Sequence, residues 1–166
     1  MYKKVLMAID ATPETEKTAE HVAEMVKNGL IGRLTLVHAV LEPNERKPRW
    51  PGEFGVEVET VRPVTLETRF AVEGKLAHVL DIFEAEGVAV DLQILVGKPE
   101  EVILHLTADG GYDLVITGSR GLNHLEGVLM GSVSSKILAQ AGCPVMVFNP
   151  VPRDLAPPRA PEFYEL

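Results

Sequence analysis

Two spacings of apolar residues alternate along this chain, and together they predict an order of strands and helices. Short, mostly apolar runs predict buried strands, because the strands of a parallel sheet are covered on both faces. Between these runs, apolar residues recur at i, i+3, i+4 and i+7, which is the spacing of one helix face. The runs predict five strands, at residues 3–9, 34–40, 88–96, 113–117 and 144–148.

Four helices are expected between these strands, and start signals such as Pro13 support the first of them. Strand and helix then alternate along residues 1–149, which predicts a parallel sheet with right-handed crossovers and helices on both faces. The expected fold is a three-layer α/β/α domain. The four helical faces contain Ala19, Val22, Ala23 and Val26; Leu76, Val79, Leu80 and Phe83; Val102, Ile103 and Leu106; and Val133, Ile137, Leu138 and Ala141.

Two segments do not follow this alternation. Residues 42–64 contain four prolines and mixed charges, which predicts a long irregular connection. Residues 150–166 contain five prolines and are expected to be a tail outside the domain of residues 1–149. The length of 166 residues fits one domain, and no apolar run approaches the 18 residues that suggest a membrane helix.

Charge and cysteine content narrow the class of protein. The net charge of −8, from 24 acidic and 16 basic side chains, opposes unspecific binding to nucleic acid or to anionic membranes. Cys143 is the single cysteine, so an internal disulfide and a multi-cysteine metal site are excluded. We expect a buried, inert thiol and a cytoplasmic protein.

The stretch from Gly118 to Ser132 carries the strongest chemical signal. Glycines stand at 118, 121, 127 and 131, directly after the apolar run 114–117 and before a helical pattern. Glycine leaves backbone N–H groups uncovered and tolerates positive φ, so such a loop can surround an anion. The positive end of the following helix also favours a phosphate. A nucleotide-phosphate site is therefore expected; the alternative is a glycine-rich turn with a serine helix cap.

The spacing distinguishes this loop from two common nucleotide motifs. The chain contains neither GxxxxGK[ST] nor GxGxxG. Instead, Gly118-x2-Gly121-x9-Gly131-Ser132 resembles the signature of the universal stress protein family, in its ATP-binding branch, and the resemblance extends over residues 1–149. It implies an adenine-nucleotide alpha-hydrolase-like fold with strand order 3-2-1-4-5. It also implies ATP, or AMP or ADP, with Mg²⁺ carried by the nucleotide phosphates.

The resemblance also implies which residues form the nucleotide site. Asp10 would line the pocket near the adenosine, although capping the first helix is an equal alternative for this carboxylate. The backbone of Ala39 would hydrogen-bond adenine. Arg120 would reach a terminal phosphate or be solvated. The implied set is Ala8, Ile9, Asp10, Ala39, Thr117, Gly118, Arg120, Gly121, Gly131, Ser132, Val133 and Ser134.

This sequence departs from the family pattern at several positions. The family often has proline at the position of Ala8 and glycine at that of Ala11, and Thr117 replaces an apolar residue beside the base. Glu126 would repel phosphates unless Mg²⁺ intervened. His38 at the end of the second strand is expected to be a structurally satisfied histidine.

The absence of a P-loop lysine and of a nucleophile–base pair favours a nucleotide sensor or carrier with at most slow hydrolysis. The alternatives are a nucleotide-cleaving or nucleotidyl-transferring enzyme of a related fold, and a dimeric interaction module with an empty pocket. Residues 144–148 form an apolar edge strand in the expected order, which predicts a homodimer through that strand. The family commonly dimerises in this way.

Overall fold

A central sheet organises the described part of the chain, residues 1–41, 61–119 and 130–149, in a computed structural model. Strands and helices alternate in it, as the sequence predicts. The elements are β1 (Tyr2–Ala8), α1 (Pro13–Lys27), β2 (Ile31–Val40), β3 (Arg62–Pro63), α2 (Leu66–Ala85), β4 (Val90–Val96), α3 (Pro99–Asp109), β5 (Leu114–Gly118), α4 (Ser132–Gln140) and β6 (Val145–Phe148).

The strands are ordered β3-β4-β2-β1-β5-β6 in the sheet. The five predicted strands thus occur in the predicted order, and all four pairings among them are parallel. The sequence missed β3, which adds to the edge of β4 in antiparallel orientation. Two residues, one of them Pro63, give no periodic signal, and a proline is tolerated only at such an edge.

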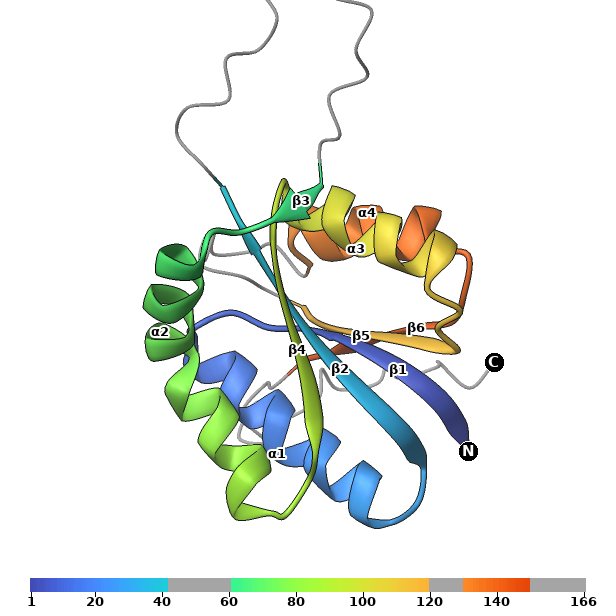
Figure 1. Cartoon of the computed structure of the whole chain (residues 1–166). Helices are drawn as coiled ribbons and strands as arrows, with labels where there is room; N and C mark the ends of the chain where they lie inside the picture. Colours follow the sequence, from blue (N-terminus) through green and yellow to red (C-terminus); the bar gives the residue numbers. More distant parts are fainter. Residues whose placement is uncertain (42–60, 120–129, 150–166) are drawn as a thin grey trace, which may run out of the picture.

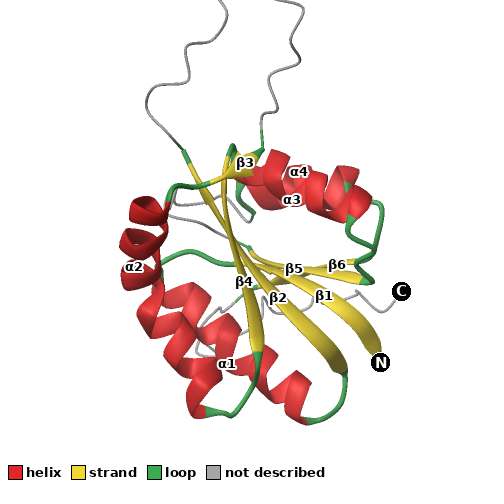
Figure 2. Cartoon of the chain, in the orientation of Figure 1, coloured by secondary structure: helices red, strands yellow, loops and turns green. Residues whose placement is uncertain are grey.

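The helices cover both faces of the sheet (Figures 1 and 2), with α1 and α2 on one face and α3 and α4 on the other. Successive side chains of a strand point to opposite faces. In β1, Val5 and Met7 accordingly pack in the core beneath α1 and α2, whereas Leu6 packs with Val115 and Ile137 beneath α3 and α4. The domain is therefore a three-layer α/β/α sandwich.

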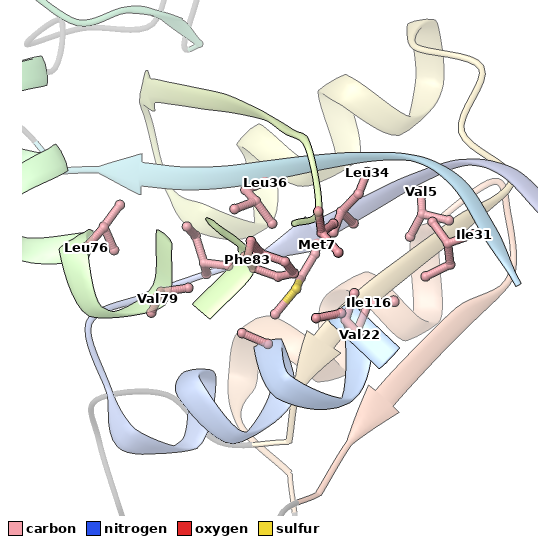
Figure 3. Packing of buried hydrophobic residues seen from close by; sticks show 14 of the residues in the cluster. Val5, Met7, Val22, Ile31, Leu34, Leu36, Leu76, Val79, Phe83 and Ile116 are labelled. Atoms are coloured by element: carbon pink, nitrogen blue, oxygen red, sulfur yellow. The ribbon is translucent and has the colours of Figure 1, made fainter. Parts of the chain in front are cut away.

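The larger of the two cores lies beneath α1 and α2. Phe83 of α2 has no exposed surface and lies close to Met7 of β1 in the middle of this layer (Figure 3). Complete burial of a side chain of this size contributes about 1.5–3 kcal/mol. Both residues belong to apolar patterns recognisable in the sequence, so the core positions follow from the spacing.

Asp113 fixes how β1 and β5 are aligned. Its Oδ2 accepts hydrogen bonds from the backbone N–H groups of Lys3 (2.7 Å) and Lys4 (3.0 Å). Its own N–H donates to the carbonyl of Lys4 at 2.8 Å. These contacts align Val5 of β1 with Leu114, the first residue of β5.

Within the described ranges, none of the helices is long and apolar enough to cross a membrane. The predicted tail, 150–166, and most of the predicted irregular connection, 42–60, lie outside the described residues. The domain boundary at residue 149 stays a prediction.

Candidate functional site

The chain leaves β1 and β5 at the same edge of the sheet but on opposite faces. β1 leads to α1 and β5 leads to α4, which cover different faces (Figure 1). Such a reversal of winding is where open α/β sheets bind ligands, outside the carboxyl ends of the strands. The ladder between the two strands ends at the pair Met7 and Ile116.

Register shows which residues share this edge. Val5 pairs with Leu114, and Asp10 and Ser119 each stand five positions further along the chain from these two residues. The predicted site residues at the ends of these two strands, Ile9 and Gly118, therefore belong to the same edge. This agrees with the expectation that Asp10 and Gly118 lie at the ends of neighbouring strands.

Asp10 supports the cap of helix α1, a role close to the capping that was one of its two alternatives. Its Oδ1 accepts hydrogen bonds from the backbone N–H of Thr12 (3.2 Å) and from the hydroxyls of Thr12 and Thr15. Thr12 is the N-cap residue of α1 and accepts from the N–H of Thr15. Among the described residues, nothing hydrogen-bonds the other carboxylate oxygen of Asp10, so the capping role leaves that oxygen open to a ligand.

The backbone of Ala39 faces the side of β2 on which β1 has already ended. The carbonyl of Val37 accepts from the N–H of Ile9 at 2.9 Å, so Val37 faces β1. The backbone groups of residues i and i+2 in a strand point to the same side. Ala39 therefore also faces the β1 side, where the β1–β2 ladder has already ended at Ala8.

His38 has a structural partner, as expected. Its Nδ1 lies 2.9 Å from the carbonyl of Ile9, and a carbonyl only accepts, so Nδ1 carries the proton. The side chain thus ties the end of β2 to the residue before Asp10. This contact supports the end of β1.

Ser119 links the two ends of the glycine-rich loop. Its carbonyl accepts from the N–H of Gly131 at 2.7 Å, and its own N–H donates to the carbonyl of Phe148 at 2.7 Å. Its hydroxyl donates to Oδ1 of Asn149 at 3.1 Å. With 3% of its surface exposed, Ser119 joins β5, α4 and β6. The sequence analysis missed this residue; a small polar side chain directly after a buried strand was the available signal.

Helix α4 begins without the side-chain cap that α1 and α2 have. Its N-cap residue is Gly131, and no side chain accepts from its first turn. Within the described residues, the N–H groups of Ser132, Val133 and Ser134 have no hydrogen-bond partner. No acidic residue stands in the first turn, unlike α3 with Glu100. The positive end of α4 is therefore available to an anion.

The glycines at the two ends of the loop do not use the positive φ that glycine tolerates. Neither Gly118 nor Gly131 has a positive φ, and Gly131 has φ −68° and ψ 161°. A serine was expected as the possible helix cap, but Gly131 holds that position and Ser132 is the first helical residue. Gly131 has no side chain, and it therefore leaves the start of the helix uncovered.

Two buried hydroxyls lie between β5 and α4. The Ser134 hydroxyl donates to the carbonyl of Gly118 at 2.6 Å. Oγ1 of Thr117 lies 3.3 Å from the same carbonyl and 3.4 Å from Oγ of Ser134. Both residues belong to the implied nucleotide site, and their hydroxyls have protein partners in the described part of the chain.

An ion pair connects α3 to α4 near their amino ends. Nζ of Lys136 donates to Oε1 of Glu100 at 2.7 Å. This hydrogen bond lowers the pKa of the Glu100 carboxyl, while partial burial opposes the shift. The charge of Lys136 is thereby engaged on the α3 side.

The described residues contain no group of three or more His, Cys, Asp or Glu side chains that could hold a metal ion. Mg²⁺ is commonly held by substrate phosphates, several waters and one or two carboxylates. The open oxygen of Asp10 is the carboxylate that the described part of this edge offers.

The structure thus brings most of the implied residues to one edge of the sheet. Arg120 and Gly121, and with them His124 and Glu126, lie outside the described residues. The implied residues at this edge are Ala8, Ile9, Asp10, Ala39, Thr117, Gly118, Gly131, Ser132, Val133 and Ser134.

A doubly wound sheet with an open helix end at its switch point defines a class of ligand-binding α/β domain. The comparison with protein families is more specific: the model of the universal stress protein family matches residues 1–149. The chain belongs to the universal stress protein family.

Sequence relatives span nearly the same length. A universal stress protein encoded in the QAH/OAS sulfhydrylase 3′ region of Thermus aquaticus is 31% identical over 147 residues, which cover 89% of this chain and 98% of the relative. A universal stress protein of Methanocaldococcus jannaschii is 30% identical over 159 residues, covering 89% of this chain and 94% of the relative.

Solved structures share the fold. A universal stress protein of Archaeoglobus fulgidus in complex with dAMP has a TM-score of 0.58 at 17% identity, covering 88% of this chain and 97% of that one. An Arabidopsis thaliana family member with AMP bound has a TM-score of 0.57 at 20% identity, covering 92% and 97%. At these identities the likeness establishes the fold.

Proposed function

We propose that this protein binds an adenine nucleotide, ATP or else AMP or ADP, at the edge formed by the carboxyl ends of β1 and β5. The observation that carries the proposal is the uncapped start of α4, where three N–H groups have no partner among the described residues. Phosphate is the ligand that such a helix end favours. The AMP and dAMP complexes of fold neighbours support the choice of nucleotide.

The described contacts support a place for each part of the nucleotide along this edge. The backbone of Ala39 would pair with adenine, and the open oxygen of Asp10 would contact the ribose or a Mg²⁺ carried by the phosphates. The N–H groups at the start of α4 would hold the phosphates, completed by the loop that contains Arg120 and Gly121. Val133 would contribute through its backbone alone.

We assign this site a sensor or carrier role with at most slow hydrolysis. Among the described residues, His38 donates through Nδ1 to the carbonyl of Ile9, and Asp10 accepts from two threonine hydroxyls. Both side chains thus have structural partners beside the proposed site, which supports a binding role for this edge. We further propose that the protein acts in the cytoplasm, because its single cysteine, the partly buried Cys143, gives the chain no internal disulfide.

A homodimer through β6 completes the proposal. β6 is one edge of the sheet, and its four residues, VMVF, are apolar and only partly buried. The opposite edge carries Pro63, which hinders further pairing. An apolar edge with no such residue favours pairing with a second copy.

Ligand-dependent stability tests the nucleotide assignment. ATP at 100 times its dissociation constant should stabilise the protein by about 2.7 kcal/mol, which raises the unfolding midpoint by a few degrees. Gly121→Val should abolish the shift, because a β-branched side chain would occupy the space of the phosphates. An unchanged shift in this variant would remove the loop from the site.

A further inference from the structure

The start of α4 carries three serines, at 132, 134 and 135, whose hydroxyls have different partners. Ser134 donates to the carbonyl of Gly118 at 2.6 Å, and Ser135 donates to the carbonyl of Gly131 at 2.9 Å. Among the described residues, Ser132 has no partner for its hydroxyl, and it is exposed. One hydroxyl is therefore free at the open helix end, and two are engaged with backbone.

A hydroxyl has a single hydrogen, and this limits what Ser134 can do. A nucleotide phosphate presents acceptor oxygens, so a serine ligand must donate to it. Ser134 already donates its hydrogen to Gly118, and 4% of its surface is exposed. Its remaining capacity is to accept, and Oγ1 of Thr117 lies 3.4 Å away on that side.

The carbonyls of Gly118 and Ser119 are consecutive, and both are bound by α4. Ser134 binds the first through its hydroxyl, and Gly131 binds the second through its N–H at 2.7 Å. The two hydrogen bonds join the end of β5 to the first turn of α4 at two points. They fix the direction in which the free N–H groups of that turn point.

We infer that Ser134 is a positioning residue of the anion site, which acts through Gly118, whereas Ser132 keeps the direct phosphate contact that the family resemblance implies. The inference rests on the proposed function, since it assigns roles within that site. It assigns Ser134 a different role from the direct ligand contact that the family resemblance implies.

Amide hydrogen exchange in the nucleotide-free protein separates the two roles. Ser134→Ala should increase the exchange rate of the Gly131 amide about fivefold or more, the effect of losing one typical hydrogen bond. Ser132→Ala is the matched control and should leave that rate within about twofold, since no contact of its hydroxyl is lost. The amides of Leu138 and Gln140 in the last turn of α4 should exchange as in the wild type in both variants, which excludes global unfolding.

ATP affinity of the same variants completes the test. Both should bind ATP more weakly, Ser132→Ala through the lost contact and Ser134→Ala through the displaced helix end. If Ser134→Ala does not fold, Ser134→Cys takes its place in both measurements. Cysteine is close to serine in size but donates poorly, so the same results are expected. Unchanged Gly131 exchange in the Ser134 variants would overturn the inference, as would faster exchange with unaltered ATP affinity. Faster exchange in a protein whose wild type binds no nucleotide would support the positioning contact and refute the proposed function.

Discussion

The backbone N–H of Gly131 donates to the carbonyl of Ser119 at 2.7 Å and joins the two ends of the glycine-rich loop. Ser119 is itself fixed to β6 through Phe148 and Asn149. The start of α4 is consequently held against the sheet at the loop ends, which lie outside the range 120–129. The helix end that we propose to bind phosphate is therefore set by the ordered frame of the domain.

Filling the open helix end with the protein's own carboxylate should abolish nucleotide binding. Gly131 has φ −68° and ψ 161°, extended backbone that any residue adopts, and it occupies the N-cap position. Gly131→Asp should therefore cap α4, keep or raise the stability by about 0.5–1 kcal/mol, and repel phosphate. Calorimetric titration with ATP, together with urea unfolding, measures both effects.

The neutral variant Gly131→Asn is the control for charge. Asparagine caps a helix about as well as aspartate but does not repel an anion. It should retain more ATP affinity than Gly131→Asp at similar stability. If Gly131→Asp binds ATP as the wild type does, phosphate is not bound at the start of α4.

Asp10 should contribute to stability as well as to binding. Its Oδ1 accepts from Thr12 and Thr15 at the start of α1, so Asp10→Ala should lower the free energy of unfolding by about 1 kcal/mol. Asp10→Asn retains an acceptor oxygen and should cost less. Chemical denaturation at neutral pH compares the two, and equal losses would show that the cap depends on charge rather than on the acceptor.

The pair of Glu100 and Lys136 should make stability depend on pH in the acid range. The hydrogen bond from Lys136 lowers the pKa of Glu100 in the folded state, so the folded protein binds this proton less readily than the unfolded chain. The contribution is therefore present at pH values above the ordinary glutamate pKa and is lost as the pH falls through the lowered value.

Glu100→Gln should reveal this contribution. The variant should be less stable at neutral pH by about 0.5–1 kcal/mol, because Lys136 is largely exposed and such pairs are weak. The difference should shrink as the pH falls below about 4.5, where the carboxylate of the unfolded chain is protonated. Thermal unfolding across the acid range measures this difference in stability. A difference that is the same at every pH would show that the ion pair does not contribute to stability.

A charge on the β6 edge should dissociate the proposed dimer. Val147 is partly buried on that edge, and Val147→Lys would place an ammonium group in the strand pairing. Light scattering at tens of micromolar should show a shift from dimer to monomer. Pro63→Lys on the opposite edge is the control and should remain dimeric. A monomeric wild type would refute the interface.

The sequence predicted where the main strands lie along the chain because each is an apolar run bounded by glycine, proline or helical spacing. Met7 and Phe83 were recognisable as core positions for the same reason. The family resemblance supplied the order of the strands in the sheet. The strand β3 was missed because Arg62 and Pro63 are too few to show a period. Such a short strand forms only because β4 offers it a free edge, and this depends on tertiary structure rather than on local sequence.

The candidate site was predictable in its location but not in its contacts. Glycine spacing and the alternation of elements located Gly118 and Gly131 at the carboxyl edge. The same spacing could not show that Ser119 joins three elements, or that the Ser134 hydroxyl donates to a carbonyl. These contacts depend on how closely α4 approaches β5, and no periodicity encodes that distance.

Calorimetric titration of the wild-type protein with ATP and Mg²⁺ tests the central claim most directly. The account predicts saturable binding of one nucleotide per chain, competition by AMP and ADP, and loss of the binding heat in Gly131→Asp. Absence of saturable binding of ATP, ADP and AMP to the folded wild-type protein would contradict it.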